Sequence, residues 1–244
     1  MGGTAMRLYL LVYARNEASG TPAPGYLIQT DDGTNILVDT GYSRETLGAY
    51  KAPDYQGMRV DDEDYVTNKL AALGLRPADI RYLVCTHLDP DHAGGHNEFP
   101  DAELVIQREQ YEAAQAEVHP RFGMTRPYWD DPKLHYRLVD GDTELVPGVE
   151  LIASGGHVPG HQSVLVTLPQ TGPVLLAIDA MTRDIAGYTP ETRPIGPFDM
   201  DEAGVRASTA KLLDLAVRRG VTLIVFGHDA EQWKNLRTAP EYYE

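Results

Sequence analysis

The sequence predicts an α/β protein in which two packed β-sheets are flanked by helices. Short apolar runs rich in β-branched residues recur along the 244-residue chain between turn signals. Helical patterns are interleaved with these runs rather than gathered in one half. No linker or internal repeat divides this order. We therefore expect residues 1–244 to form a single domain, with two sheets packed face to face and helices outside.

The first third of the chain is predicted to begin as an antiparallel meander. Three strands are expected, at 7–13, 26–30 and 35–38. Asp31-Asp32-Gly33 is a strong hairpin turn between the last two. Residues 42–60 are polar and are expected to form a loop. Acidic residues at 61–64 then favour a helix start, and Gly74 ends that helix.

Further strands and helices alternate through the remaining two thirds. Strands are expected at 80–85, 104–107, 138–139, 149–153, 164–168, 174–178 and 223–226, and helices at 108–118 and 205–219. Two irregular Pro-rich segments, 119–136 and 183–200, are candidate pocket walls, because long loops in compact domains are often functional. Their aromatic side chains would favour a partly apolar substrate, although packing against the sheets explains them equally well. These aromatics are Phe122, Tyr128, Trp129 and Phe198.

Charge and composition exclude several classes of partner. The formal net charge is −15, and so acidic a surface repels nucleic acid and anionic membranes. Cys85 is the single cysteine, so an internal disulfide is impossible and a cytoplasmic location is expected. No signal peptide and no apolar run of ~18 residues is present. The composition leaves open whether the protein is a monomer or a homodimer.

The informative feature is a cluster of imidazole and carboxylate side chains that follows a predicted strand. His87, Asp89, Asp91 and His92 fall within six residues, directly after the strand that ends near Cys85. Loops just beyond strand ends are where functional sites concentrate. A single His or Asp at such a place is usually structural, but four in six residues are difficult to explain by packing alone.

Three more candidates follow other predicted strands: His157, Asp179 and His228. If these strands lie side by side, their ends form one rim and the seven side chains meet. Such N and O ligands suit two divalent ions, which could be Zn²⁺, Fe²⁺, Mn²⁺ or Co²⁺. Asp39 also follows a strand, and is either a turn former or a partner that orients a ligand histidine. His161 fits a structural role and a functional role equally well.

These residues resemble the metallo-β-lactamase superfamily signature, H-x-H-x-D-H followed by single His, Asp and His ligands. The similarity is closest to the quorum-quenching N-acyl-homoserine lactonases, and it extends from about residue 26 to the end. The stretches that carry it include Leu37-Val38-Asp39-Thr40-Gly41, Asp91-His92-Ala93-Gly94-Gly95, Pro159-Gly160-His161-Gln162 and Phe226-Gly227-His228-Asp229.

The resemblance implies an αββα sandwich with two metal ions, usually zinc. His87, Asp89 and His157 would hold one ion, and Asp91, His92 and His228 the other, with Asp179 bridging. It also implies a lactone or related ester as substrate, N-acyl-homoserine lactone favoured, attacked by a hydroxide that bridges the ions. Asp91 would pass a proton to the leaving alkoxide.

The chain departs from the lactonase pattern at three positions. Asp89 stands where the signature has its second His, Pro90 replaces a bulky aromatic, and Thr182 replaces a tyrosine that helps to hold the substrate carbonyl. Asp89 adds negative charge and should lower the Lewis acidity of its ion. Candidates to take over the role of the tyrosine are Tyr188, Tyr128 and His119, since the short side chain of Thr182 would not reach equally far. Thr182 and Trp129 are further candidates for substrate contact.

Other functions compete with lactone hydrolysis. The same site would also suit another ester, a thioester or a phosphotriester. A carboxylate at Asp89 is shared with the flavodiiron branch, which makes a diiron oxidoreductase an alternative, although the chain has no flavin-binding signature. A third alternative is a non-catalytic member that only binds a ligand, with Asp89 and Thr182 as marks of lost activity.

Overall fold

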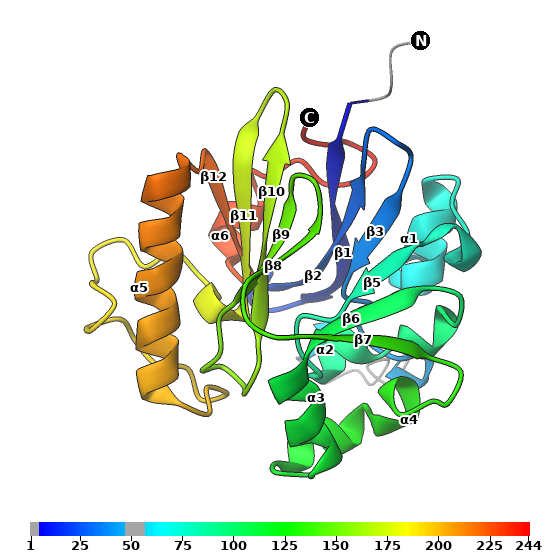
Figure 1. The fold of residues 1–244 in the computed structure, drawn as a ribbon, viewed down its shortest axis with the longest axis horizontal. Helices are drawn as coiled ribbons and strands as arrows, with labels where there is room; N and C mark the ends of the chain where they lie inside the picture. Colours follow the sequence, from blue (N-terminus) through cyan, green and yellow to red (C-terminus); the bar gives the residue numbers. More distant parts are fainter. Residues whose placement is uncertain (1–4, 47–56) are drawn as a thin grey trace.

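The computed structural model describes residues 5–46 and 57–244, which form two sheets packed face to face between helices (Figure 1). The first sheet has seven strands in the order β4-β1-β2-β3-β5-β6-β7. Its strands are β1 (Arg7–Asn16), β2 (Pro22–Gln29), β3 (Asn35–Val38), β4 (Met58–Arg59), β5 (Tyr82–Val84), β6 (Glu103–Gln107) and β7 (His135–Val139). The second sheet has five strands in the order β12-β11-β10-β9-β8. These are β8 (Thr143–Val146), β9 (Val149–Ala153), β10 (Gln162–Leu168), β11 (Gly172–Ile178) and β12 (Leu223–Phe226).

Three apolar clusters separate the layers, because alternate residues of a strand point to opposite faces. Leu8 and Leu10 of β1 pack in the cluster between the sheets, together with Val164 and Val166 of β10. The alternate residues Tyr9 and Leu11 belong to the cluster under the helices that cover the first sheet. Both faces of the central strands are therefore buried, which explains their nearly continuous apolar sequences.

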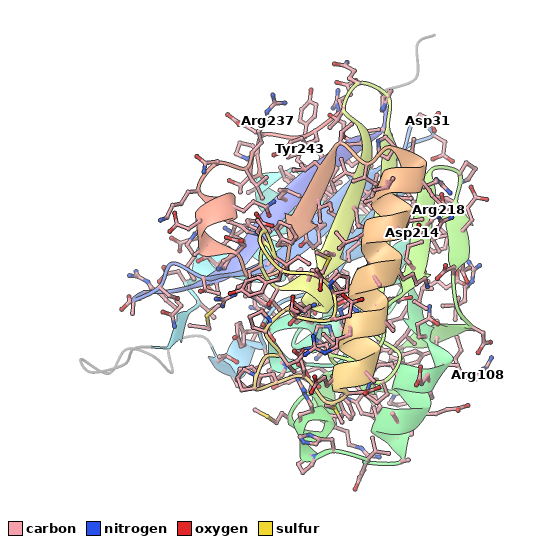
Figure 2. The ribbon with its side chains drawn as sticks, turned by 90° about the vertical axis from the view of Figure 1, so that its left-hand side faces the viewer. Asp31, Arg108, Asp214, Arg218, Arg237 and Tyr243 are labelled. Carbon is pink, nitrogen blue, oxygen red and sulfur yellow. The ribbon has the colours of Figure 1, made fainter. Side chains whose placement is uncertain are left out.

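Helices cover the outer face of each sheet (Figure 1). On the first sheet lie α1 (Val66–Ala72), α2 (Pro90–Ala93), α3 (Arg108–Gln115) and α4 (Arg126–Trp129). The second sheet is covered by α5 (Glu202–Arg219), and α6 (Ala230–Trp233) follows β12. Leu212 of α5 packs on Leu165 and Leu175 in the third cluster. The opposite face of α5 is solvent-exposed, where Arg218 pairs with Asp214 at 2.6 Å (Figure 2).

The strand directions bring the predicted ligand loops to one end of both sheets. β3, β5 and β6 run parallel, so the residues after β3 and β5 leave the first sheet at the same edge. In the second sheet β11 runs parallel to β12 and antiparallel to β10, which is antiparallel to β9. The residues after β9, β11 and β12 therefore also meet at one edge.

Most predicted elements are confirmed, with small differences at their ends. The expectation of one irregular segment over 119–136 was wrong, because two short helical segments and the start of β7 lie there. Strand β8 was missed, since its sequence Thr143-Glu144-Leu145-Val146 has too few apolar residues to stand out. The predicted 42–60 loop lies partly outside the described residues, and in its described part the prediction missed the short strand β4, which pairs with β1. No described helix is both long and apolar enough to cross a membrane.

Candidate metal centre

The loop after β5, which contains His87, Asp89, Asp91 and His92, is fixed by packing against the loop after β3. Thr40 N donates to His92 O at 2.8 Å, and Gly94 N donates to Gly41 O at 2.8 Å. A Cβ on Gly94 would lie 2.2 Å from Ser43 N, so only glycine allows this approach. Two of the motifs that carry the family resemblance therefore pack against each other.

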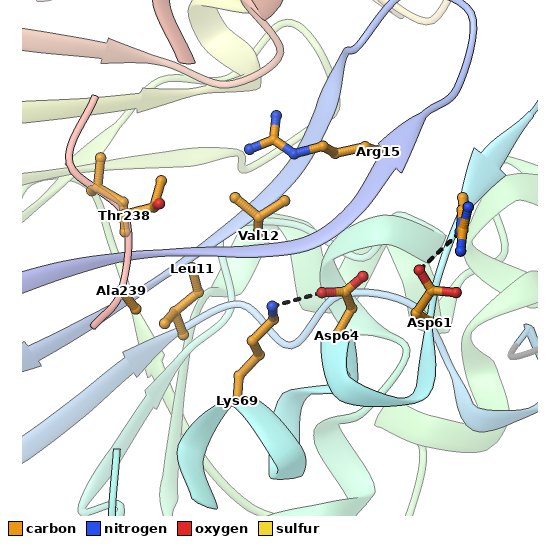
Figure 3. A pocket seen from close by; sticks show the side chains of 10 residues that line it. Leu11, Val12, Arg15, Asp61, Asp64, Lys69, Thr238 and Ala239 are labelled. Carbon is orange, nitrogen blue, oxygen red and sulfur yellow. Dashed lines mark hydrogen bonds and ion pairs between the residues drawn. The ribbon is translucent and has the colours of Figure 1, made fainter. Parts of the chain in front are cut away.

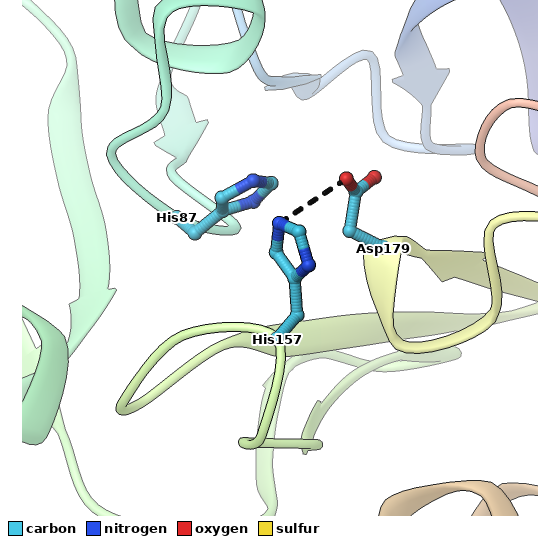
Figure 4. A group of neighbouring side chains, drawn as sticks. All are labelled: His87, His157 and Asp179. Atoms are coloured by element: carbon cyan, nitrogen blue, oxygen red, sulfur yellow. Dashed lines mark ion pairs between the residues drawn. The ribbon is translucent and has the colours of Figure 1, made fainter. Parts of the chain in front are cut away.

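The first ligand group consists of His87, His157 and Asp179, whose candidate ligand atoms lie within 4.8 Å of one another. They come from the loops after β5, β9 and β11 and converge from both sheets (Figure 4). His157 Nε2 lies 3.4 Å from Asp179 Oδ2. All three side chains are almost fully buried.

The second ligand group consists of Asp91, His92 and His228, again with ligand atoms within 4.8 Å of one another. Asp91 Oδ2 lies 3.6 Å from the Nε2 atom of each histidine. Asp179 lies between the groups, because its Oδ2 atom is also 3.2 Å from His228 Nε2. Six of the seven predicted ligands thus form two adjoining groups, with Asp179 in the position of a bridge.

A shared carboxylate orients one histidine of each group. Asp39 Oδ2 accepts from His92 Nδ1 at 2.8 Å and from Thr86 Oγ1 at 2.6 Å. Because the Thr86 hydroxyl hydrogen is used on Asp39, Thr86 Oγ1 accepts from His87 Nδ1, 3.1 Å away. Of the two roles that the sequence allowed for Asp39, the structure favours the one that orients a candidate ligand histidine. Asp39 holds His92 directly and His87 through Thr86, so it acts on both groups.

The other two histidines are held from their Nδ1 atoms as well. His228 Nδ1 lies 2.7 Å from Pro22 O, and a carbonyl can only accept, so Nδ1 carries the proton and the lone pair of Nε2 faces the site. His157 Nδ1 lies 2.9 Å from Asp199 Oδ1. The sequence reasoning missed Asp199, because its position in the 183–200 segment has no local pattern that connects it to His157.

The buried atoms at the centre fit a divalent metal ion. His87 Nε2, His92 Nε2 and Asp179 Oδ1 are buried and have no hydrogen-bond partner among the described residues. Buried polar atoms without partners are rare and call for an explanation. Imidazole nitrogens and carboxylate oxygens aimed at common points, with each distal ring nitrogen held, are the ligand arrangement of zinc and related ions.

The local charges favour cations in both groups. Burial alone opposes protonation of His92, yet Asp91, Asp39 and Asp179 raise its pKa to about 10. His157 and His228 are also buried, and neighbouring carboxylates raise the pKa of each to about 9. In His87, by contrast, burial and the neighbouring His92 lower the pKa. The carboxylates around these histidines therefore favour positive charge at this centre, in the form of protons or of metal ions.

Backbone strain adjoins the centre on both sheets. Ile178, directly before Asp179, has φ 53° and ψ −134°, which is a rare conformation for a β-branched residue. Asp39 has φ 60°. Strained residues concentrate at functional sites, where the surrounding structure fixes them.

Asp89, the seventh predicted ligand, has a different partner. Its Oδ2 atom lies 3.3 Å from His157 Nε2 and 3.5 Å from His87 Nε2. Both of its oxygens are also bound by Arg121, with Nε to Oδ1 at 2.7 Å and Nη2 to Oδ2. Arg121 was not among the sequence candidates, since a lone arginine in an irregular segment carries no signal.

The structure corrects one candidate for the substrate pocket and places the others. Trp129 is fully buried and donates to Phe122 O at 3.1 Å, so it belongs to the core and has no surface for a substrate. His119 is exposed and accepts from Arg121 N at 3.2 Å. Tyr128 donates its hydroxyl to Glu45.

Two further candidates lie in the chain after Asp179. Thr182 O accepts from His228 N at 2.7 Å, so Thr182 adjoins the second ligand group through its main chain. Tyr188 is exposed. His161 takes the structural role, because it is buried between Ser154 Oγ at 2.9 Å and Asp179 N at 3.2 Å.

A cavity of about 400 Å³ lies elsewhere, beside β1 (Figure 3). Its charged lining is largely paired, with Lys69 Nζ 2.6 Å from Asp64 and Arg59 Nε 2.8 Å from Asp61. None of its lining residues belongs to either ligand group. The buried His and Asp groups, rather than this cavity, therefore define the candidate site.

Two sheets packed between helices, with paired His and Asp groups at one end, define a metallohydrolase. A family model described as the metallo-β-lactamase superfamily matches residues 20–228. The chain belongs to the metallo-β-lactamase superfamily and is a lactonase-like hydrolase of that fold, with divalent metal as its cofactor.

Within this superfamily, the chain is similar to N-acyl homoserine lactonases. The chain is 37% identical over 227 residues to an N-acyl homoserine lactonase of Bacillus thuringiensis, covering 89% of this chain and 85% of the relative. It is 35% identical over 239 residues to the N-acyl homoserine lactonase AttM of Azorhizobium caulinodans, covering 91% and 88%. A solved N-acyl homoserine lactone hydrolase, with its product N-hexanoyl-L-homoserine at the catalytic metal centre, matches with TM-score 0.82 and 32% identity over 98% of this chain and all of that one.

Proposed function

We propose that this protein opens the ring of a lactone by hydrolysis, with N-acyl homoserine lactones as the favoured substrates. The observation that carries the proposal is the pair of ligand groups that adjoin at Asp179. The Nε2 atoms of His87 and His92 are buried there without a hydrogen-bond partner among the described residues. The similarity to curated N-acyl homoserine lactonases over most of the chain supports the substrate class. Residues 1–244 would then act as one catalytic unit.

His87, His157, Asp179 and Asp89 would hold one ion, and Asp91, His92, His228 and Asp179 the other. When bound, two divalent ions, preferably zinc, would polarise the lactone carbonyl and supply a hydroxide at neutral pH. The chain itself holds the ligand imidazoles with their Nε2 lone pairs directed inward, through Asp39, Asp199 and Pro22 O.

Asp91 is the proposed proton carrier. It is the most exposed member of the two ligand groups, with 22% of its side chain accessible. Among the described residues, its Oδ2 atom lies 3.6 Å from His92 Nε2 and 3.6 Å from His228 Nε2. One oxygen can therefore face the histidines while the other delivers a proton to the leaving alkoxide.

The substrate would be held at the open side of the second group. Thr182 adjoins that side, and exposed Tyr188 and Phe198 lie in the segment that follows it. Tyr128 and His119 are the candidates from the other irregular segment. Partly apolar walls of this kind would suit an acyl chain.

The test is hydrolysis by purified protein loaded with zinc, iron, manganese or cobalt. Substrates should be acyl-homoserine lactones of several chain lengths, simple lactones, aryl esters, a thioester and a phosphotriester. We expect ring opening of lactones to dominate, with Asp91→Asn lowering kcat by about 10²–10⁴-fold. Preference for a thioester or phosphotriester would redirect the assignment, and no turnover of any substrate would refute it.

A further inference from the structure

Arg121 places a guanidinium directly against the first ligand group. Its Nε and Nη2 atoms bind the two oxygens of Asp89, and Nη2 also lies 3.3 Å from His157 Nε2. Its remaining nitrogen, Nη1, donates to Phe198 O at 2.6 Å. Every guanidinium nitrogen is thus used to hold the arginine in this one position.

The pair is sequestered from water. The Arg121 side chain is 13% exposed and that of Asp89 is 8% exposed. Two parallel N–H···O contacts between an arginine and a carboxylate form the strongest common type of protein ion pair. Burial limits solvent screening of this pair, so Arg121 is a fixed positive charge at the site.

The contacts of Asp89 Oδ2 show why this charge matters for metal binding. Ligand atoms ~2.0–2.1 Å from a tetrahedral zinc ion lie about 3.3 Å apart. Asp89 Oδ2 has this spacing from His157 Nε2, at 3.3 Å, and nearly so from His87 Nε2, at 3.5 Å. The same oxygen and the same His157 nitrogen contact Arg121 Nη2. A metal ion and Arg121 Nη2 would therefore compete for the same two atoms, Asp89 Oδ2 and His157 Nε2.

The second ligand group has no comparable competitor in the described residues. Asp91 contacts His92 and His228, and His228 also contacts Asp179 and Pro22 O. Neither side chain is paired with an arginine or lysine among the described residues. The difference between the groups lies in the substitution at position 89 together with its arginine partner.

We propose that Arg121 competes with a metal ion for Asp89, so that the first group binds its ion more weakly than the second. The proposal rests on the metal ligands of the proposed function, but it concerns affinity rather than turnover. Arg121 is a positioning residue in this view, because it acts through Asp89. For an ion to bind in the first group, Arg121 Nη2 would have to move away from His157 Nε2.

The experiment measures zinc affinity with a competing chelator on the full-length, metal-free protein. Arg121→Gln removes the charge, and Arg121→Lys keeps the charge but cannot bind both oxygens of Asp89 with two parallel N–H groups. The matched control is Arg126→Gln, since Arg126 pairs with Asp130 at 2.9 Å on the surface nearby. His228→Ala in each background assigns the two dissociation constants, because it damages only the second group's own ligand set.

We expect two unequal constants in the unaltered protein. Arg121→Gln should tighten the weaker one roughly tenfold or more, the scale of one charge-assisted hydrogen bond. Arg121→Lys should give a smaller gain and Arg126→Gln none. In an Asp89→Asn background the gain from Arg121→Gln should disappear, because the competition is then removed.

An unchanged or weaker first constant in Arg121→Gln, with the second constant intact as evidence of folding, would overturn the inference. So would a gain that persists in Asp89→Asn. If lactone hydrolysis proceeds with two Arg121-insensitive constants, this inference alone fails. If the protein binds no zinc, iron, manganese or cobalt, the proposed function fails with it.

Discussion

The two ligand groups contain similar side chains but are held by different parts of the molecule. In the second group, His92 is fixed by Asp39 after β3 and His228 by the main chain of Pro22 at the start of β2. In the first group, His157 is fixed by Asp199, and Asp89 by Arg121. Asp199 comes from the Pro-rich segment 183–200, and Arg121 from a short 3-10 helix, Pro120–Met124, that precedes α4.

This difference indicates how the site can vary within one fold. The second group depends on residues at β2 and β3 of the seven-stranded sheet. Changes that weaken the second group therefore also disturb the core. In the first group, His87 also depends on Asp39 through Thr86. His157 depends on Asp199, and the adjoining Asp89 on Arg121; both partners lie outside the strands and can change with little effect on packing. The departure from the family signature falls on Asp89, in the loop-supported group.

The largest effect is expected where the groups meet. Asp179→Ala removes the carboxylate that contacts His157 at 3.4 Å and His228 at 3.2 Å. Both ions should be lost and kcat/KM for a lactone should fall by roughly 10³-fold or more. Metal analysis and a lactonase assay measure this, with Asp214→Asn on the exposed face of α5 as control. Retention of both ions would show that Asp179 is not shared.

A second pair of variants separates the groups. Asp39→Asn should weaken metal binding in both, since Asp39 holds His92 directly and His87 through Thr86. Asp199→Asn should weaken only the first group, through His157. Each loss should be about 10–100-fold in affinity, the usual effect of removing a partner of a ligand histidine. Equal effects of Asp199→Asn on both groups would contradict the separation.

The metal-free protein should lose stability as the pH rises from 7 to 10. His92, with a pKa raised to about 10, and His157 and His228, with pKa values raised to about 9, bind protons more tightly when folded than when unfolded. Their contribution is full below pH ~6.5, the unfolded pKa, and is lost through pH 9–10.

Thermal unfolding scans measure this effect, and we expect Tm to fall by roughly 5 °C over that interval. The metal-loaded protein serves as the control, because ions rather than protons then neutralise the carboxylates. Metal-free protein that becomes more stable toward pH 10 would contradict the charge arrangement described for the site.

The smallest effect is expected at Thr182, beside the second group. Its main-chain oxygen holds His228 N, so Thr182→Ala should leave zinc affinity within about twofold, as for most substitutions outside the core. A rise in KM for the lactone, without a change in metal content, would identify the hydroxyl as a substrate contact. A fall in zinc affinity would show instead that the side chain supports His228.

Sequence reasoning succeeded where residues act through their own chemistry and local position. The strands at 35–38, 149–153 and 223–226 have the predicted bounds, and six of the seven candidate ligands lie together in the two groups. It failed where an aromatic side chain had two possible surroundings. Trp129 was a pocket candidate, yet it is fully buried, because nothing in its neighbours shows which face the chain turns inward.

The sequence alone thus determined the two-sheet class and singled out the candidate ligand side chains, since both follow from hydrophobic periodicity and from polar residues placed after strands. The tertiary structure decided which side chains face one another across 32 to 68 residues of chain. The pairing of Asp89 with Arg121 and of His157 with Asp199 depends on how two loops fold over the sheet ends. No local pattern encodes such long-range contacts, and they make the two halves of the site unequal.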